Sequence, residues 1–274
     1  MAPTNKAVIV TGAASGIGLA ITLALLAEGH DVTAVDRDGQ ALHRLATQEA
    51  GRRGALNIVT ADLAHPDSPA QVTAAALVRF GRIDVLVNNA GIGQYAVRPD
   101  QRQNPIRFWE TTPEQWWRFM TINGAGPINM ARAVVPHMLA SRRGQVISVT
   151  TSLGTMVRAG HLLYGSAKAA AESGMAVLAA DLEGTGVTSN VLVPGGTTNT
   201  ALVGDRSGDP AKMLQPEIMV PPLLWLLSEE GATVNGRRFV AADWDTTLPP
   251  SVAAQKAGAP IAWGGIARMP IEPQ

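Results

Sequence analysis

The chain has 274 residues, 46% of them hydrophobic, and its 22 basic and 22 acidic residues give a formal net charge of zero. A neutral chain has no broad field that would attract nucleic acid or an anionic membrane, so a small molecule is the more natural partner. The absence of cysteine excludes disulfides and any cysteine-based metal site or nucleophile. Because the sequence shows neither a signal-peptide pattern nor 18 consecutive apolar residues, we expect a soluble cytoplasmic protein.

A glycine-rich loop follows the first expected strand, residues 6–11, and leads into an apolar helical pattern. This order is what a pyrophosphate site requires, because glycines let the backbone turn tightly and approach the phosphates while the helix N-terminus attracts their charge. A glycine-rich turn without a ligand is the alternative interpretation. The residues that we expect to hold a dinucleotide here are Gly12, Ser15, Gly16, Ile17 and Gly18.

The second expected strand, residues 31–36, ends in an acidic residue, Asp36. A carboxylate at this position can accept hydrogen bonds from an adenosine ribose and repels a 2′-phosphate, so we predict NAD rather than NADP. Ser15, an uncharged residue directly before Gly16, agrees with this prediction. Arg37 leaves NADP open, and an ordinary turn role for Asp36 is the alternative.

Strands and helices alternate regularly through the first half of the chain. Further buried strands are expected at residues 55–61 and 83–93, with a helix at 67–80 between them. Asp62 and Leu63 follow the third strand, where they would flank an adenine. The alternation predicts an α/β fold, a doubly wound parallel sheet in three α/β/α layers. We expect a single domain over residues 1–245 and a C-terminal extension at 246–274.

The alternation breaks at residues 94–112, which are polar and contain two prolines. A loop of this length beside a ligand site often contacts substrate, and a solvated insertion is the alternative. A long helix is expected from Pro113 to about Ser141. Asn123 lies in its otherwise apolar middle, where a buried Asn needs a hydrogen-bonding reason. Glycines 124 and 126 and the following proline predict a bend or bulge there.

Tyr164 and Lys168 stand four residues apart in an expected helix, so the phenol and the ammonium share one face. A cation within about 4–6 Å stabilises a phenolate and lowers the pKa of the phenol, which would let Tyr164 exchange a proton near neutral pH. This spacing also occurs by chance in many helices, so the pair is informative only together with other motifs. Three hydroxyls just upstream offer a partner for the reacting oxygen: Thr150, Thr151 and Ser152.

The last third of the chain begins with an expected strand at residues 186–194, which ends in a loop rich in Gly and Thr. Such a loop lies where α/β proteins bind ligands, and we expect residues 195–215 to form a second substrate loop. A helix at about 216–229 and a strand near 237–242 complete the sheet, whereas residues 246–274 show no clear periodicity. Neither a His-x-x-x-His pair nor a Gly-x-Ser-x-Gly motif occurs, which gives little weight to a metal site or a serine hydrolase.

In their order and spacing these motifs resemble the short-chain dehydrogenase/reductase family over about residues 5–245. The resemblance rests on TGAASGIG at 11–18, Asp36, Asp62, NNAG at 88–91, Asn123, Tyr164, Lys168 and Pro194-Gly195. It implies a single Rossmann domain and reversible hydride transfer between a nicotinamide ring and a secondary alcohol or carbonyl carbon. Tyr164 would be the general acid/base, Lys168 would lower its pKa and bind the nicotinamide ribose, and Asn123 would hold a water in a proton relay. Further implied cofactor contacts are Asn89, Ala90, Gly91, Pro194, Gly195 and Thr197.

The sequence departs from the family pattern in two places. The position of the Ser that usually steadies the substrate oxygen, thirteen residues before the Tyr, is occupied by Thr151, and Ser152 follows it. Successive side chains of a strand point to opposite faces, so we favour Thr151 and keep Ser152 for the case that the strand ends early. Thr197 stands where an apolar residue of the family commonly holds the nicotinamide carboxamide, so a polar side chain takes that place here.

The substrate is expected to be an apolar or aromatic ketone or alcohol, since apolar residues dominate the segments near Tyr164. Arg158 and His161 would add a polar contact or lie on the surface. A dinucleotide-binding regulatory protein without activity and a reductase of an imine or a carrier-bound ketone are the alternatives. The resemblance implies a homo-oligomer, a dimer or tetramer. The candidate substrate contacts are Leu153, Met156, Leu162, Phe108, Trp109 and Met213.

Overall fold

The computed structural model describes residues 5–49, 51, 53–203 and 209–264. Within them one sheet has the strand order β3-β2-β1-β4-β5-β6-β7-β8. All neighbouring pairs are parallel except β7 and β8, which are antiparallel. The strands are β1 (Ala7–Thr11), β2 (Asp31–Asp36), β3 (Leu56–Thr60), β4 (Val85–Asn88), β5 (Gly144–Val149), β6 (Val187–Val193), β7 (Arg237–Val240) and β8 (Gly258–Pro260).

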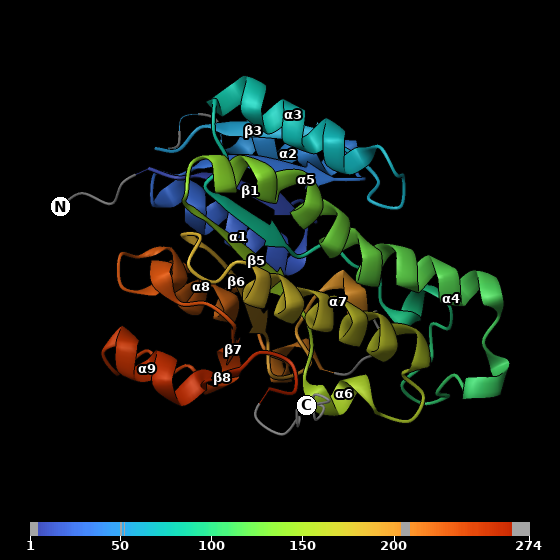
Figure 1. The fold of residues 1–274 in the computed structure, drawn as a ribbon. Coiled ribbons are helices and arrows are strands. Elements are labelled where there is room, and N and C mark those ends of the chain that lie inside the picture. The colour runs from blue at the N-terminus through green and yellow to red at the C-terminus, as the bar shows by residue number, and fades with distance from the viewer. Residues whose placement is uncertain (1–4, 50, 52, 204–208, 265–274) are drawn as a thin grey trace, which may run out of the picture.

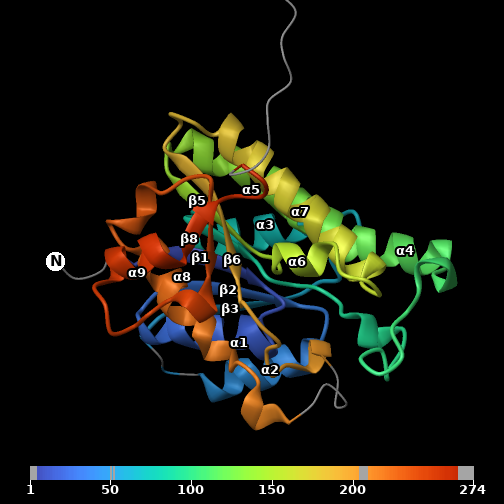
Figure 2. The ribbon, with the colours of Figure 1, turned by 90° about the horizontal axis from the view of Figure 1, so that it is seen from below.

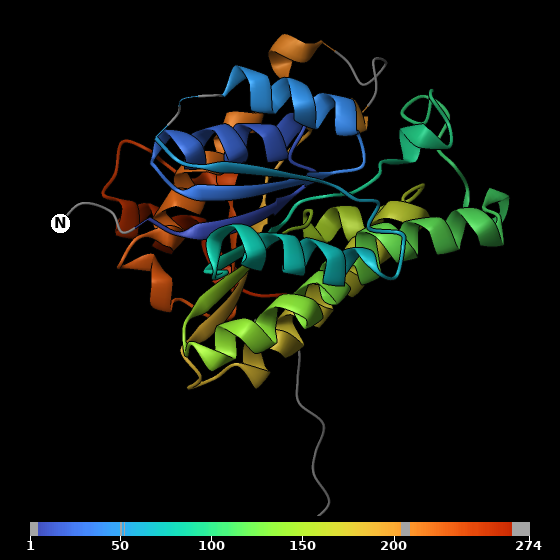
Figure 3. The same cartoon turned by 90° about the horizontal axis from the view of Figure 1, so that it is seen from above.

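Helices cover both faces of the sheet, as Figures 1, 2 and 3 show from three directions. One face packs against α1 (Gly16–Ala27), α2 (Gly39–Gln48), α8 (Val220–Leu227) and α9 (Pro250–Ala257). The other face packs against α3 (Ser68–Phe80), α5 (Gly126–Ala140) and α7 (Leu162–Asp181). This arrangement confirms the predicted three-layer, doubly wound α/β fold.

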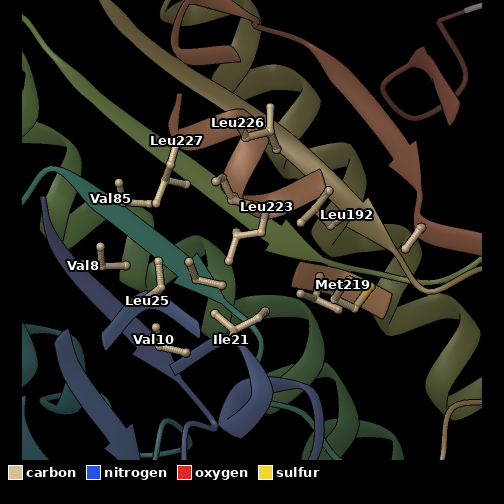
Figure 4. Close-up of a cluster of buried hydrophobic side chains, with 14 of the residues drawn as sticks. Val8, Val10, Ile21, Leu25, Val85, Leu192, Met219, Leu223, Leu226 and Leu227 are labelled. Atoms are coloured by element: carbon tan, nitrogen blue, oxygen red, sulfur yellow. The ribbon is translucent and has the colours of Figure 1, made fainter. Parts of the chain in front are cut away.

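The sheet is apolar on both faces because it is covered on both. Every residue of β1 and β6 is buried, which explains why these strands are continuous runs of mostly β-branched residues. Figure 4 shows how the first helical layer meets the sheet: strand valines face leucines of α1 and α8. The labelled side chains of this core are Val8, Val10, Ile21, Leu25, Val85, Leu192, Met219, Leu223, Leu226 and Leu227.

The long helix expected after residue 113 is interrupted where the sequence predicted a bend or bulge. α4 (Pro113–Phe119) passes into a π-helical segment, Met120–Ala125, before α5 begins. π-Helical turns are rare and frequently occur at functional sites. Asn123 lies inside this segment. α4 and the loop before it project away from the sheet in Figures 1 and 3.

The C-terminal part of the described chain contains two elements that the sequence did not predict, α9 and β8. The buried face of α9 consists of Ala253, Ala254 and Ala257, whose small side chains give little hydrophobic periodicity. β8 has three residues, too few for an alternating pattern, and is held by pairing with β7. The sheet therefore continues into the segment expected to be an extension.

The remaining elements are short. None of the helices in the described part of the chain is long and apolar enough to cross a membrane. The short helix α6 (Leu153–Met156) precedes α7, and single turns lie at Gln94–Ala96, Phe108–Glu110, Ala201–Val203, Pro210–Lys212, Pro216–Met219, Gly231–Thr233 and Ala241–Asp243.

Candidate active site

Two adjoining cavities lie along the carboxyl ends of the parallel strands, where ligands bind in open α/β sheets. The first, which we call the glycine-loop cavity, has a volume of about 450 Å³. The second, the tyrosine cavity, has about 380 Å³ and is lined by Tyr164 and Lys168. The cavities adjoin each other, since they share six lining residues: Ile17, Asn89, Gly93, Tyr95, Thr200 and Leu202.

In the glycine loop, Gly12 lies close to the backbone of Ala90 and Gly18 close to the backbone of Gly12. Gly12 has φ of +66°, and a Cβ atom there would lie 2.9 Å from the Cα of Ala90. A Cβ on Gly18 would overlap the carbonyl oxygen of Gly12. Helix α1 starts after Ser15 without a side-chain cap and without an acidic residue in its first turn, so its N-terminal N–H groups favour an anion. The loop therefore has the geometry that a pyrophosphate needs.

Most of the predicted cofactor residues gather around these cavities. Gly18 lines neither of them and instead packs α1 against the loop. The tyrosine cavity contains Pro194, Gly195 and Thr197. The glycine-loop cavity contains Gly12, Ser15, Gly16, Ile17, Asp36, Arg37, Asp62, Leu63, Asn89, Ala90 and Gly91.

Asp36 ends β2 with its carboxylate fixed by two backbone groups. The N–H of Ala14 donates to Oδ2 at 3.1 Å, and the N–H of Asp38 donates to Oδ1 at 3.1 Å. Each carboxylate oxygen retains acceptor capacity for a further donor. The side chain is thus held against the glycine loop, in the wall of the cavity that it shares with Arg37.

Tyr164 and Lys168 lie on the face of α7 that meets the end of β5. The ammonium nitrogen of Lys168 is 5.9 Å from the centre of the Tyr164 ring and donates to the carbonyl oxygen of Val149 at 2.8 Å. Burial raises the pKa of Tyr164 to about 12 and lowers the pKa of Lys168 to about 8. Burial of the phenol opposes the lowering of the Tyr164 pKa that we expect from Lys168, so this role of Lys168 remains a prediction.

All three residues of the hydroxyl cluster after β5 line the tyrosine cavity. The hydroxyl of Thr150 donates to the buried carboxylate of Glu172 at 2.6 Å. Thr151 and Ser152 both line the tyrosine cavity together with Tyr164. The strand ends at Val149, which is the early end that keeps Ser152 as an alternative to Thr151. The assignment of the substrate-binding hydroxyl to Thr151 therefore remains a prediction.

Asn123 is fully buried in the π-helical segment. Its Oδ1 accepts from the N–H of Ile92 at 2.8 Å, and its Nδ2 donates to the carbonyl oxygen of Ile92 at 2.9 Å. These two bonds supply the hydrogen-bonding reason that a buried Asn requires, and they hold the loop after β4. The predicted role of Asn123 in holding a water remains a prediction, because both polar side-chain atoms are already bonded to Ile92.

Gln94 is a buried residue that the sequence analysis missed. Its Nε2 donates to the carbonyl oxygen of Gly160 at 2.7 Å, and its Oε1 accepts from the N–H of Tyr164 at 3.2 Å. One amide thereby fixes the loop before α7 and occupies an N–H in the first turn of that helix. The available signal was an uncharged polar residue just beyond the NNAG motif, in a segment interpreted as a polar loop.

The apolar residues expected to contact substrate do not line the tyrosine cavity. Met156 is buried in the interior, and Trp109 is 82% exposed on the projecting loop. Arg158 and His161 do line the cavity, together with Gln94. The four-residue helix α6 turns Met156 inward, since closeness to Tyr164 in the sequence does not fix the direction in which a side chain points. Four further expected contacts are also absent from the cavity wall: Phe108, Leu153, Leu162 and Met213.

The loop after β6 connects the two cavities. A Cβ on Gly16 would lie 2.8 Å from Cγ2 of Thr200, and a Cβ on Gly93 would overlap the carbonyl oxygen of Leu202. Residues 199–203 therefore lie directly over both glycine-containing loops. Within the described ranges no group of three His, Cys, Asp or Glu residues could hold a metal ion.

The comparisons with known proteins agree with this geometry. Residues 6–210 match the family described as short chain dehydrogenase. The chain is 37% identical over 192 residues to 1-deoxy-11-beta-hydroxypentalenate dehydrogenase of Streptomyces exfoliatus, covering 70% of this chain and 67% of that one. It is 30% identical over 242 residues to 3-oxoacyl-(acyl-carrier-protein) reductase of Thermotoga maritima, covering 85% and 94%.

A solved structure shows the same fold with a cofactor. The 3-ketoacyl-(acyl-carrier-protein) reductase of Brucella melitensis, complexed with NADH, is similar with a TM-score of 0.73 and 25% identity, covering 86% of this chain and 95% of that one. Fold, site and family match lead to one conclusion. The chain belongs to the short chain dehydrogenase family and is an oxidoreductase of that family.

Proposed function

We propose that this chain transfers a hydride between NAD(H) and a secondary alcohol or ketone. The observation that carries the proposal is the meeting of Tyr164, Lys168 and Thr151 in one cavity that adjoins the glycine-loop cavity. Glycine backbone and an uncapped helix N-terminus in the first cavity fit a pyrophosphate. A nicotinamide dinucleotide spanning both cavities would thus bring its ring to Tyr164.

The protein's own residues supply the proton and hold the substrate oxygen. When bound, the cofactor donates a hydride to the carbonyl carbon or accepts one from the alcohol carbon. In the reducing direction Tyr164 donates its phenolic proton to the carbonyl oxygen, and the resulting phenolate takes up a proton from water. The hydroxyl of Thr151 donates a hydrogen bond to the same oxygen, and the ammonium of Lys168 stabilises the phenolate. Because burial raises the pKa of Tyr164, the phenol is protonated at neutral pH, and its action as an acid there would depend on stabilisation of the phenolate by Lys168.

NAD is the proposed cofactor because of Asp36. Its carboxylate is fixed by Ala14 and Asp38 at the wall of the glycine-loop cavity, where it would accept a hydrogen bond from a ribose hydroxyl. A 2′-phosphate at the same place would meet a negative charge. Arg37 lines the same cavity and is the feature that would favour NADP.

The proposed substrate is polar, and this changes the expectation of an apolar or aromatic one. The described residues that line the tyrosine cavity include three basic residues, Arg158, His161 and Lys168, and no acidic residue. Amide and hydroxyl groups make up much of the remaining wall. A ketone or alcohol that carries further hydroxyl groups or a negative charge fits such a wall better than a hydrocarbon.

A ketone bound to a carrier protein is the second candidate. The observation that favours it is the similarity to the Thermotoga 3-oxoacyl-(acyl-carrier-protein) reductase over nearly the full length of both chains. The two candidates differ in whether the ketone is a free small molecule or is attached to a carrier protein. Turnover of a short free 3-oxo ester at a rate similar to its carrier-bound form would favour the free substrate.

The proposal is tested with Tyr164→Phe. Titration with NADH and NADPH, followed by nicotinamide fluorescence, measures cofactor binding, and a panel of polar ketones and alcohols measures turnover. We expect the wild type to bind NADH more tightly, and Tyr164→Phe to bind NADH normally while turnover falls by about 10³-fold or more. Full activity of Tyr164→Phe, or no binding of either dinucleotide by the wild type, would overturn the proposal.

A further inference from the structure

A buried ionic cluster lies behind the tyrosine cavity and joins distant parts of the chain. The carboxylate of Glu172, on α7, is fully buried and accepts from Nε of Arg238, on β7, at 2.9 Å. It also accepts from the hydroxyl of Thr150 at 2.6 Å and from the N–H of Ala262 at 3.1 Å. A buried carboxylate is costly unless it is paired and hydrogen-bonded, and these three donors satisfy it.

The cluster reaches the proposed catalytic hydroxyl through the backbone. Nη2 of Arg238 donates to the carbonyl oxygen of Thr151 at 3.1 Å, while Nε of the same guanidinium holds Glu172. Lys168 binds the carbonyl oxygen of Val149, and Glu172 binds the side chain of Thr150. Three consecutive residues at the end of β5 are therefore each held by a charged side chain.

Helix α7 carries the proposed acid/base and two of the charged side chains on one face. Tyr164, Lys168 and Glu172 are spaced four residues apart, so they lie on one face over two turns. That face runs along the end of β5, as the contacts of Lys168 and Glu172 with Val149 and Thr150 show. The helix that carries the proposed acid/base thus also fixes the loop that carries its hydroxyl partner.

The segment after β8 completes the cluster with a strained residue. Ala262 has φ of +52°, a conformation that costs a non-glycine residue about 1 kcal/mol or more. Its neighbour Ile261 is buried, and the N–H of Ile261 donates to the carbonyl oxygen of Gly236 at 3.0 Å. The strain persists because this packing and the bond to Glu172 together determine the backbone. The C-terminal part of the described chain is therefore tied to the site.

We propose that Glu172 and Arg238 are positioning residues that hold the Thr151 hydroxyl toward Tyr164, and that residues 258–264 complete this clamp. The inference rests on the proposed oxidoreductase function. A catalytic hydroxyl must be held within about 0.5 Å of its productive position, and misplacement by about 1 Å costs up to a hundredfold in rate. The clamp acts on the side chain of Thr150 and the backbone of Thr151, neither of which lines the glycine-loop cavity.

The main test replaces the whole ion pair by apolar residues, Glu172→Met with Arg238→Met. Removing one partner leaves an uncompensated buried charge and is strongly destabilising, whereas apolar replacement of both partners avoids that charge. We expect a folded double variant with a lower unfolding midpoint, since the Thr150 hydroxyl and the Ala262 N–H lose their acceptor, and with unchanged NADH affinity but kcat at least about tenfold lower. A kcat within twofold of the wild type would overturn the proposal.

Two single variants separate positioning from general stability. Glu172→Gln keeps an acceptor for Arg238 and Ala262 and a donor for the Thr150 hydroxyl but leaves the Arg238 charge uncompensated, so we expect a lower unfolding midpoint with nearly normal kcat. Arg82→Met breaks a second ion pair, at the opposite end of the strands, in which Nε of Arg82 lies 2.7 Å from Oδ2 of Asp84. This variant should lower the unfolding midpoint without lowering kcat. An equal loss of kcat in Arg82→Met would mean that destabilisation alone explains the effect.

Ala262 offers a matched pair of variants for the role of the C-terminal segment. Ala262→Gly retains the N–H and relieves the strained φ, so we expect normal kcat. Ala262→Pro removes the N–H that donates to Glu172 and cannot adopt a positive φ, so we expect a lower kcat at similar NADH affinity. Equal kcat values for these two variants would exclude the segment from the clamp.

Hydrogen exchange tests the clamp without any turnover. In the ligand-free protein we expect amides of residues 149–156 to exchange faster in the double Met variant than in the wild type, while the glycine loop stays unchanged. Unchanged exchange of residues 149–156 would contradict the clamp whatever the activity. A wild type that binds NADH but turns over no substrate would instead count against the proposed function, and the exchange data would still decide on the clamp.

Discussion

The ammonium of Lys168 donates to the carbonyl oxygen of Val149 at 2.8 Å and thereby ties helix α7 to the end of strand β5. The side chain is 3% exposed, so this bond lies in the interior. Burial lowers the pKa of Lys168 from 10.5 to about 8. A buried cation that serves the proposed reaction therefore makes the stability of the protein depend on pH.

The first prediction concerns this dependence. The pKa of Lys168 in the folded protein lies below its value in the unfolded chain, so the unfolded chain binds more protons between pH 8 and 10.5. The free energy of unfolding therefore rises with pH through that window. The increase in the free energy of unfolding that Lys168 causes amounts to about 3 kcal/mol and is lost again as pH falls through the same window. We expect Lys168→Met to lack this slope. Denaturant unfolding at several pH values, compared with the exposed Lys256→Met, measures it; identical slopes in Lys168→Met and wild type would contradict the prediction.

The second prediction concerns cofactor choice. Asp36→Ser removes the charge that would repel a 2′-phosphate and the two bonds from the N–H groups of Ala14 and Asp38. We expect NADH to bind about 10- to 100-fold more weakly, and the preference for NADH over NADPH to shrink or reverse. Fluorescence titration measures both affinities. Asp38→Asn removes a charge two residues away but keeps the helix cap to Ala41, and it should leave the preference unchanged.

The third prediction concerns packing under the glycine loop. A Cβ atom on Gly18 would overlap the carbonyl oxygen of Gly12 and lie 2.5 Å from Nδ2 of Asn89. Gly18→Ala must therefore displace backbone, which costs about 2 kcal/mol or more, and NADH affinity should fall with it. A Cβ on Gly154 meets nothing within 4 Å, so Gly154→Ala should change stability by less than about 0.5 kcal/mol. Equal unfolding midpoints for the two variants would contradict the prediction and show that the glycine loop accommodates a Cβ atom at position 18.

The sequence was sufficient wherever the information is local. A strand, a glycine loop and a helix follow one another directly, so the glycine loop and the position of Asp36 were predictable from residues 6–36. The spacing of Tyr164 and Lys168 predicted a shared helix face for the same reason. The bulge near Asn123 followed from the adjacent glycines and proline.

Side-chain pairs between distant segments were not predictable in this way. Gln94 and Gly160 are 66 positions apart, and so are Glu172 and Arg238. No periodicity links such residues, since the tertiary fold alone brings them together. The same holds for β8, which pairs with β7 after an intervening helix. The buried position of Met156 was not predictable either, because the direction of a side chain in a short turn depends on its packing.

The fourth prediction uses one of these distant contacts. Gln94 and Gln101 both donate to the carbonyl oxygen of Gly160, at 2.7 and 3.3 Å, but Gln94 also accepts from the N–H of Tyr164. Gln94→Leu therefore releases the first turn of α7, which carries the proposed acid/base, and leaves a buried N–H without this acceptor. We expect kcat to fall by about tenfold, with NADH affinity unchanged.

Gln101→Leu is the matched control for this prediction, because it removes a bond to the same carbonyl oxygen without touching Tyr164. Gln101 also accepts from the N–H of Ile106, so both variants lose two hydrogen bonds and should lower the unfolding midpoint by similar amounts. Only Gln94→Leu should slow turnover, since Gln94 alone of the two holds the Tyr164 backbone. A similar loss of kcat in both variants would assign the effect to the loop at Gly160 rather than to the position of Tyr164.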